Sequence, residues 1–253
     1  MSGPLIPSIR GFKVSKIGES QDSCRDAWRT NQRREGVFSP SNLRLAIADG
    51  ATTTSGSGLW GQILVDAAVE GIAPWCRVSY RERILARLRA RWHHQARALL
   101  PQPLPWFAEA SLNRGGFSSL MKAEVRGNTW RAEGWGDSCL FHLRFGELVQ
   151  MLPDLDPEDF NKHPFLLASV PGHDRDLTRN AVIGHGNLLR GDVLLLATDA
   201  MACWLLSTKA WPETLREIRS LTSEAAYGVW IDSLRRARGL KNDDTTLVFV
   251  EFL

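Results

Sequence analysis

The chain has 253 residues, of which 43% are hydrophobic and 23% are charged. This apolar content excludes a disordered chain, because it suffices to build a substantial core. With 31 basic and 28 acidic residues, the net charge of +3 is too small to indicate nucleic acid or an anionic membrane as the main partner.

Short apolar runs and helical periodicity define the predicted elements in chain order. The predicted strands cover residues 43–47, 129–134, 139–144, 193–198 and 245–251. The predicted helices cover residues 59–72, 81–100 and 223–238, where apolar residues recur at helical spacing. Strands grouped apart from helices predict an α+β layered fold rather than a β-α-β alternation. No Pro/Gly/Ser-rich linker divides the pattern, so we expect one domain over residues 1–253.

One long stretch, residues 151–187, shows little periodicity and contains four prolines. A loop of this length in a compact domain is usually functional or partly disordered. We therefore expect a loop here rather than regular structure.

Acidic residues stand at the ends of several predicted strands. Asp49 and Asp199 follow apolar strands, Asp137 and Asp243 precede others, and Asp22 lies in the polar stretch ESQDS. Since strand ends in a common sheet converge, these carboxylates are expected to meet in one cleft. Clustered carboxylates repel one another, and an all-oxygen donor set suits Mg²⁺ or Mn²⁺. A single Asp at a strand end is more often a turn former or a helix cap, so the hypothesis depends on the whole set.

Four segments around these acids carry a family resemblance. They are ADGATTTSGSG (48–58), WGDSCLFHLRFGEL (135–148), GDVLLLATDAMACWLL (191–206) and NDDTTLVFVE (242–251). In order and spacing they resemble the metal-dependent PP2C-type protein phosphatases, and SQDS (20–23) is similar to that family's N-terminal acidic element. The likeness runs from about residue 10 to residue 253 and is closest to the compact bacterial branch.

The resemblance implies a role for each acid. Asp49 would bridge two metal ions, and the backbone carbonyl of Gly50 would bind the second of them. Asp199 and Asp243 would hold the first ion. Asp22 would act at the same centre, either as a ligand or through a metal-bound water.

The resemblance also implies a fold and a reaction. The fold is a four-layer α-β-β-α sandwich, in which two antiparallel sheets pack face to face and are flanked by helix pairs. The cofactor is two Mn²⁺ or Mg²⁺ ions, with Asp137 near a third, weaker one. The reaction is hydrolysis of phosphoserine or phosphothreonine by direct attack of a water that bridges the two ions. Asp22, Asp49, Asp199 and Asp243 would be catalytic through this water.

Several positions depart from the family pattern. Ala51 stands where some members carry a His that is a candidate general acid, and Ala200 replaces the glycine of the second Asp-Gly pair. The usual phosphate-binding Arg has no clear counterpart, and Lys16 is the nearest candidate. The hydroxyls of residues 52–55 and of Ser57 are interpreted either as phosphate or loop contacts or as helix caps.

The implied partner is a phosphorylated protein that is the target of a Ser/Thr kinase, with no nucleic acid and no membrane. Two alternatives stay open: a catalytically silent relative that binds phosphorylated or kinase partners, and a hydrolase of small phosphate esters. The four cysteines show no metal-clip or disulfide spacing, no signal peptide is visible, and apolar runs fall far below the roughly 20 residues of a membrane helix. These features predict a cytoplasmic protein in which Cys24 and Cys139 are core thiols rather than nucleophiles.

Overall fold

The computed structural model describes residues 5–32, 42–51, 56–71, 75, 77–100, 103, 105–174, 176–237 and 239–253. Within them the strands are β1 (Pro7–Val14), β2 (Ala27–Thr30), β3 (Leu43–Ala48), β4 (Phe117–Ser118), β5 (Leu120–Arg126), β6 (Thr129–Trp135), β7 (Cys139–Arg144), β8 (Glu147–Leu152), β9 (Leu167–Ala168), β10 (Val182–Asn187), β11 (Val193–Ala197) and β12 (Thr245–Phe252). The helices are α1 (Ser57–Glu70), α2 (Val78–Ala98), α3 (Trp106–Arg114), α4 (Asp199–Thr208), α5 (Trp211–Ser220) and α6 (Glu224–Ala237), with the short 3-10 helices η1 (Gln21–Ser23) and η2 (Pro157–Asn161).

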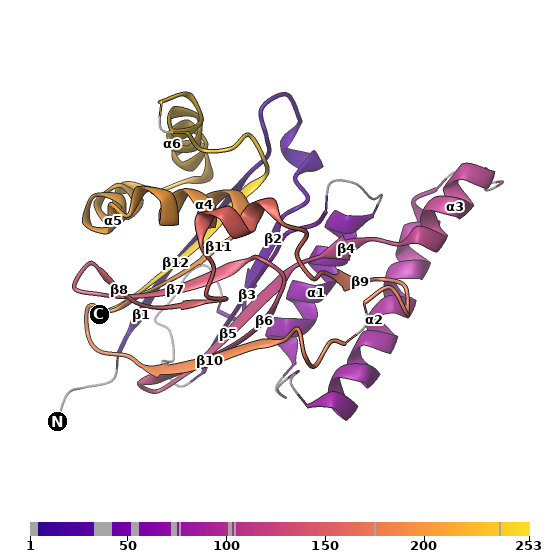
Figure 1. Cartoon of the computed structure of the whole chain (residues 1–253), viewed down its shortest axis with the longest axis horizontal. Coiled ribbons are helices and arrows are strands. Elements are labelled where there is room, and N and C mark those ends of the chain that lie inside the picture. The colour runs from indigo at the N-terminus through magenta and orange to yellow at the C-terminus, as the bar shows by residue number, and fades with distance from the viewer. Residues whose placement is uncertain are drawn as a thin grey trace.

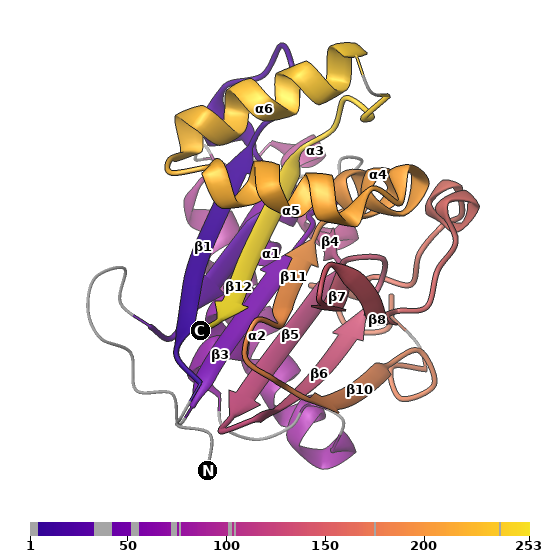
Figure 2. The same cartoon turned by 90° about the vertical axis from the view of Figure 1, so that its left-hand side faces the viewer.

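The strands form two antiparallel sheets of five strands each. The first sheet has the order β1-β12-β11-β7-β8, and the second has the order β10-β6-β5-β3-β2. A small additional sheet pairs β4 with β9. Helices α4, α5 and α6 cover the first sheet, and α1 and α2 lie against the second (Figures 1 and 2).

Three apolar clusters separate the four layers. Between the sheets, Leu45 and Ile47 of β3 pack with Leu194 of β11 and Val248 of β12. The other two clusters lie between each sheet and its helices. Every residue of β11 is buried, which explains its uninterrupted apolar sequence, because both faces of the strand are covered. The α-β-β-α sandwich expected from the resemblance is therefore the observed fold.

The predicted strands and helices recur close to their expected places, but several elements were not predicted. They are the strands β1, β2, β5, β8, β10 and the minor pair β4 and β9, and the helices α3, α4 and α5. The expectation of an irregular loop over residues 151–187 was wrong for β10, β9 and η2. The strand β10 has no apolar alternation because Gly184 and Gly186 lie against the side chains of Leu152 and Trp130, where a Cβ would collide.

Among the described residues, no helix combines the length and the apolar character needed to cross a bilayer. The grouping of residues 1–253 into a single domain stays a prediction.

Candidate metal centre

Strand register brings aspartates from both sheets to one edge of the sandwich. In the first sheet the end of β11 pairs with the starts of β7 and β12, so Asp199, Asp137 and Asp243 lie at the same edge. In the second sheet the start of β2 pairs with the end of β3, so Asp26, just before β2, lies beside Asp49, just after β3. The two sheets thus present their acids to each other.

Direct contacts join the acids of the two sheets. The hydroxyl of Thr198, at the end of β11, donates a hydrogen bond of 2.8 Å to Asp26 Oδ2. Asp49 and Asp199 also lie within electrostatic range of each other, because the charge of Asp199 helps to raise the pKa of Asp49. Neighbouring carboxylates of this kind disfavour each other's ionised form.

Burial and mutual repulsion raise the pKa values of the group. Burial, with the charges of Asp199 and other neighbours, raises the pKa of Asp26 to about 8. Burial, with Asp199 nearby, raises the pKa of Asp137 to about 7. Burial, and then the charges of Asp26, Asp199, Asp137 and Asp243, hold the pKa of Asp49 well above its ordinary value. Such a group either keeps protons at neutral pH or needs positive charge beside it.

The donor chemistry of this group fits a hard divalent cation. The aspartates supply only oxygen, as Mg²⁺ and Mn²⁺ prefer. Asp26 Oδ1 is buried and has no hydrogen-bond partner among the described residues, so one carboxylate oxygen is left over for a ligand. In the conformation described, no three His, Cys, Asp or Glu side chains of the described residues are arranged to hold one ion. The ligand atoms are therefore of the type that these ions prefer, but in this conformation the side chains are not arranged around an ion site.

A lysine that the sequence analysis did not single out supplies positive charge to this group. Lys241 Nζ lies 3.0 Å from Asp243 Oδ2 and 3.9 Å from Asp199 Oδ2. Burial lowers the pKa of Lys241, but its hydrogen bond with Asp243 and the charge of Asp199 raise it above the ordinary value. Its side chain is 65% exposed, so the ammonium can leave the carboxylates without disrupting the core.

The N-terminal acid of the group is Asp26 rather than Asp22. Asp22 is exposed on η1, whereas Asp26 is only 2% exposed and is bonded to Thr198. The predicted role of Asp22 at the centre is thus not supported by its position. Asp26 fits the same strand-end rule that selected the others, but β2 is a short edge strand that contains the charged residue Arg29, so it was not recognised.

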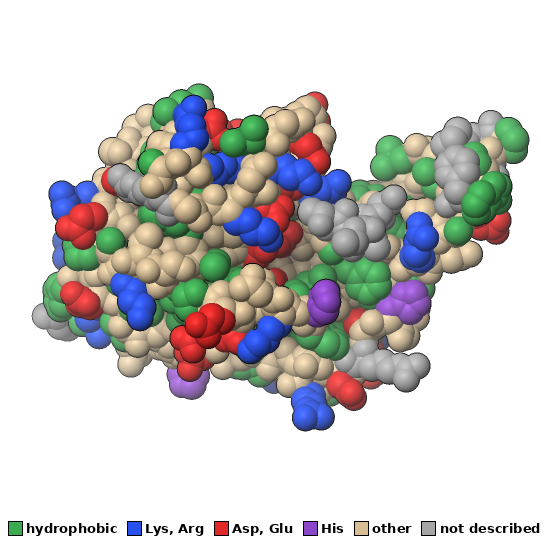
Figure 3. Space-filling model, turned by 45° about the horizontal axis from the view of Figure 1, so that its top comes forward, with side chains coloured by type: hydrophobic (Ala, Val, Ile, Leu, Met, Phe, Trp, Pro, Cys, Tyr) green, Lys and Arg blue, Asp and Glu red, His purple; other side chains and the backbone are tan. Residues whose placement is uncertain are grey.

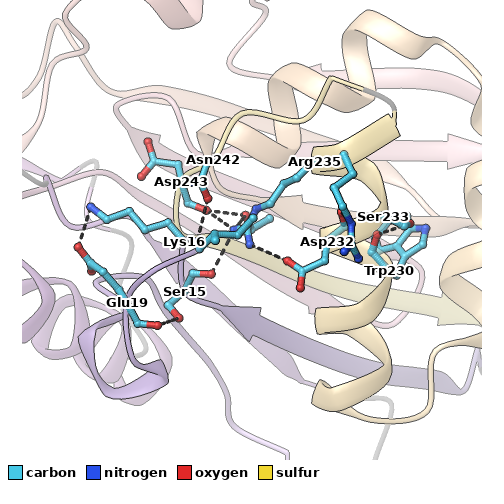
Figure 4. A network of polar contacts seen from close by, with 12 residues as sticks. Ser15, Lys16, Glu19, Trp230, Asp232, Ser233, Arg235, Asn242 and Asp243 are labelled. Carbon is cyan, nitrogen blue, oxygen red and sulfur yellow. Dashed lines mark hydrogen bonds and ion pairs between the residues drawn. The ribbon is translucent and has the colours of Figure 1, made fainter.

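The ammonium of Lys16 is paired with a glutamate outside the acid group. Its ammonium forms an ion pair of 3.0 Å with Glu19, and Figure 4 shows its side chain extended toward that residue. Its backbone N–H donates instead to Asp244 Oδ1 at 3.0 Å. The role of Lys16 as a phosphate ligand stays a prediction, and Lys241 is the described lysine that contacts the acids.

The loop that carries Asp243 is fixed by buried polar contacts. Arg235 of α6 donates to the carbonyl of Asp243 at 2.6 Å and to the carbonyl of Ser15 at 3.2 Å (Figure 4). Asp244 accepts hydrogen bonds from the backbone N–H groups of Lys16 and Arg25. Because these contacts occupy Asp244, its neighbour Asp243 is the residue left to face the centre.

The Asp49–Gly50 turn is held by close backbone packing. The carbonyl of Asp49 accepts hydrogen bonds from Ser119 N–H at 2.9 Å and from the Ser118 hydroxyl at 2.8 Å. A Cβ on Gly50 would come within 2.9 Å of the carbonyl oxygen of Arg25. Only glycine therefore fits here. This close packing is compatible with the predicted role of the Gly50 backbone carbonyl as an ion ligand.

The remaining predictions near the centre concern hydroxyls and thiols. Residues 52–55 lie outside the described residues, and the Ser57 hydroxyl accepts a hydrogen bond from Phe117 N–H at 3.2 Å. Burial, with Asp26 and Asp244 nearby, raises the pKa of the Cys24 thiol to about 12. Cys139 is fully buried, and burial raises its pKa as well. Both thiols stay protonated at neutral pH, as expected of packing residues rather than nucleophiles.

Part of the acid group is open to solvent, because the side chains of Asp199 and Asp243 are 17% and 21% exposed. Figure 3 shows a face of the molecule on which acidic side chains are recessed, with Lys and Arg side chains close to them. A charged substrate group can therefore approach this edge of the sandwich from solvent.

Comparison with known proteins gives matches in structure but not in sequence. No family model and no curated protein matches the chain. The serine/threonine phosphatase PstP/Ppp of Mycobacterium tuberculosis has a TM-score of 0.62 and 17% identity, covering 98% of this chain and 99% of that one. PppA, a regulatory component of the T6SS in Pseudomonas aeruginosa, has a TM-score of 0.54 and 20% identity, covering 98% and 100%. A PstP catalytic domain in complex with two manganese ions has a TM-score of 0.56 and 17% identity, covering 98% and 99%. Over nearly its whole length, the chain has the fold of the serine/threonine phosphatases.

Proposed function

We propose that this chain is a PP2C-type phosphatase that removes phosphate from phosphoserine and phosphothreonine in proteins with the help of Mn²⁺ or Mg²⁺. One observation carries the proposal: aspartates from both sheets lie together at one edge of the sandwich, where burial and mutual repulsion raise the pKa values of Asp26, Asp49 and Asp199 and so favour a bound cation. A purely structural core has no use for such an arrangement. The shared fold and the manganese complex of PstP support the choice of reaction and ion.

The residues that would hold the ions come from four strand ends. Asp49 would lie between two ions, with the Gly50 carbonyl on the second; Asp199 and Asp243 would serve the first. Asp26 would take the role predicted for Asp22, because its free Oδ1 belongs to the buried group. When bound, the ions would activate water for in-line attack on phosphorus and neutralise charge on the phosphoryl oxygens.

The protein's own contribution is positioning and charge. The hydroxyl of Thr198 holds the carboxylate of Asp26, and Arg235 holds the backbone carbonyl of Asp243 and so positions the loop that carries this acid. Asp137 lies within electrostatic range of Asp199 and suits a third, weaker ion. Lys241, once displaced from the carboxylates, is free to pair with a phosphoryl oxygen of the substrate.

The proposed substrate is a cytoplasmic protein that a Ser/Thr kinase has phosphorylated. The alternatives of a catalytically silent binding protein and of a small-ester hydrolase make different predictions in the same assay. A silent protein binds a phosphopeptide without releasing phosphate, and a small-ester hydrolase prefers metabolite phosphates to phosphopeptides.

The test is phosphate release from a phosphothreonine peptide with Mn²⁺ and with chelator. We expect activity that requires the ion and falls at least about 100-fold in Asp199→Asn, as expected for a residue that acts through the ions. Asp22→Asn is the matched control, because it makes the same chemical change on an exposed residue. Calorimetric titration of Mn²⁺ into each variant checks binding separately. A folded wild-type protein without turnover at millimolar Mn²⁺ would overturn the proposal.

A further inference from the structure

A groove runs from the acid group along α4. It has a volume of about 260 Å³ and lies between η2 and α4. Asp199 forms one end of its wall and is also a member of the acid group, so the groove and the centre are continuous. We name it the α4 groove.

The α4 groove has an apolar part and a polar part. The apolar part is formed by Phe160, Ala200, Cys203 and Trp204, and the polar part is formed by Asn161, Asp199, Ser207, Thr208 and Lys241. Half-buried Phe160 of η2 and half-buried Cys203 of α4 face it. The exposed residues Ser207 and Thr208 lie toward the end of α4. The Cys203 thiol donates a hydrogen bond of 3.6 Å to the carbonyl of Pro157, which links α4 to η2 beside the groove.

Lys241 stands where the groove meets the acids. It lines the groove and pairs with Asp243 and Asp199 at the same time. A ligand can place its anionic group at the acids and the rest of its structure in the groove. Such a ligand lies beside the ammonium of Lys241. The charge favours a phosphorylated occupant, and the walls favour an apolar side chain.

We propose that the α4 groove binds the side chain next to the phosphorylated residue of the substrate and selects an apolar one. This inference rests on the proposed function. Consecutive Cα atoms lie about 3.8 Å apart, and the groove begins at Asp199, so a neighbour of a phosphoresidue bound at the acids is within reach of the groove. A small phosphate ester has no such neighbour and gains nothing from the groove. The occupant is thus a stretch of polypeptide, and the substrate class is phosphoproteins rather than metabolites.

The test fills the groove without touching the acids. Ser207→Trp places a large ring at its rim, and Ser207→Ala is the matched control that removes the same hydroxyl without filling space. Ser207 is exposed near the end of its helix, so both variants are expected to fold, which thermal unfolding checks. Each protein is assayed with p-nitrophenyl phosphate and with two phosphothreonine peptides that carry Leu or Gly beside the phosphoresidue.

For the wild type and Ser207→Ala we expect a KM roughly tenfold lower for the Leu peptide than for the Gly peptide. In Ser207→Trp the two peptides should become equal, while kcat/KM for p-nitrophenyl phosphate stays within about twofold. Phe160→Ala is a second variant, which removes a wall and should also abolish the preference for Leu. Equal KM values for the two peptides in the wild type, or an equal loss on peptide and small ester in Ser207→Trp, would overturn the inference.

A binding measurement separates this inference from the proposed function. Fluorescence anisotropy with a labelled phosphonate analogue of the Leu peptide reports occupation of the groove without turnover. Weaker binding to Ser207→Trp than to Ser207→Ala supports the groove even if no variant hydrolyses phosphate, whereas equal binding contradicts it. Absence of hydrolysis by all variants contradicts only the proposed reaction.

Discussion

The buried acids make the metal-free protein less stable as the pH rises. Asp26 is the clearest case, because burial and its neighbours raise its pKa from 3.8 to about 8. Between these two values the folded protein holds a proton that the unfolded chain has released. The free energy of unfolding therefore falls with increasing pH across this window, and the contribution is complete only below the unfolded pKa.

The magnitude follows from the linkage relation. One extra proton bound by the folded state costs about 1.4 kcal/mol of stability per pH unit. From about pH 5 to about pH 8, Asp26 alone accounts for a loss of about 4 kcal/mol. Asp137, with a pKa raised to about 7 by burial and by Asp199, adds to the loss over part of the same range. The variant Asp26→Asn is uncharged at every pH and keeps an oxygen that can accept the hydrogen bond from Thr198.

The assay is urea unfolding in chelator at several pH values from 5 to 8.5, for the wild type, Asp26→Asn and the exposed control Asp22→Asn. The wild type and the control should lose several kcal/mol, and Asp26→Asn should give a shallower slope, because Asp49 and Asp137 still contribute. Added Mn²⁺ should restore stability to the wild type at high pH, because a bound ion favours the folded state. A wild-type profile that rises with pH, or one with the same slope in Asp26→Asn, would refute the reasoning.

Three further predictions concern the glycine beside Asp49, a buried ion pair elsewhere in the fold and the lysine beside the acids. Gly50→Ala brings a Cβ within 2.9 Å of the Arg25 carbonyl oxygen, so we expect a loss of about 1–3 kcal/mol and weaker Mn²⁺ binding, measured by urea unfolding and calorimetry; unchanged affinity would contradict the close packing. Asp174→Asn breaks the buried ion pair in which Arg89 donates to both carboxylate oxygens at 2.7 Å. We expect the free energy of unfolding to fall by about 3–5 kcal/mol and proteolysis near residues 165–180 to become faster. Lys241→Gln removes the ammonium from Asp199 and Asp243 and should tighten Mn²⁺ binding several-fold in calorimetry at neutral pH, with Lys241→Arg as the charge-preserving control; weaker binding would count against competition between lysine and ion.

The acids that follow or precede long apolar strands could be predicted from the sequence. Asp49, Asp199 and Asp243 adjoin strands that are buried on both faces, so their apolar runs are unmistakable. The expected convergence within a common sheet holds for Asp199 and Asp243, but Asp49 belongs to the other sheet, and the packing of the two sheets brings it to the same edge. The fold class followed from the same runs and from the family resemblance.

The rest depended on contacts that have no local signal. Asp26 precedes a four-residue edge strand, so nothing nearby distinguished it from Asp22 in the more familiar SQDS stretch. Lys241 acquires its role only when its loop meets the start of α4, and the sequence shows it as one more surface charge. β10 was missed because its register is set by tertiary contacts of Gly184 and Gly186, which remove the side chains that normally mark a strand.

The acids of the centre come from two different sheets. A bound ion is therefore expected to restrain local opening between the sheets. Thr198 joins the layers by donating to Asp26 and by accepting a hydrogen bond of 2.9 Å from Thr246 N–H. An ion bound by Asp49 and Asp199 would connect the two sheets at the same edge. Amide hydrogen exchange at Thr246 and Ala27 should therefore slow when Mn²⁺ binds, while exchange at the opposite edge of the sheets stays constant. The centre would then add a reversible, ion-dependent link between two sheets that apolar packing and the Thr198–Asp26 hydrogen bond already hold together.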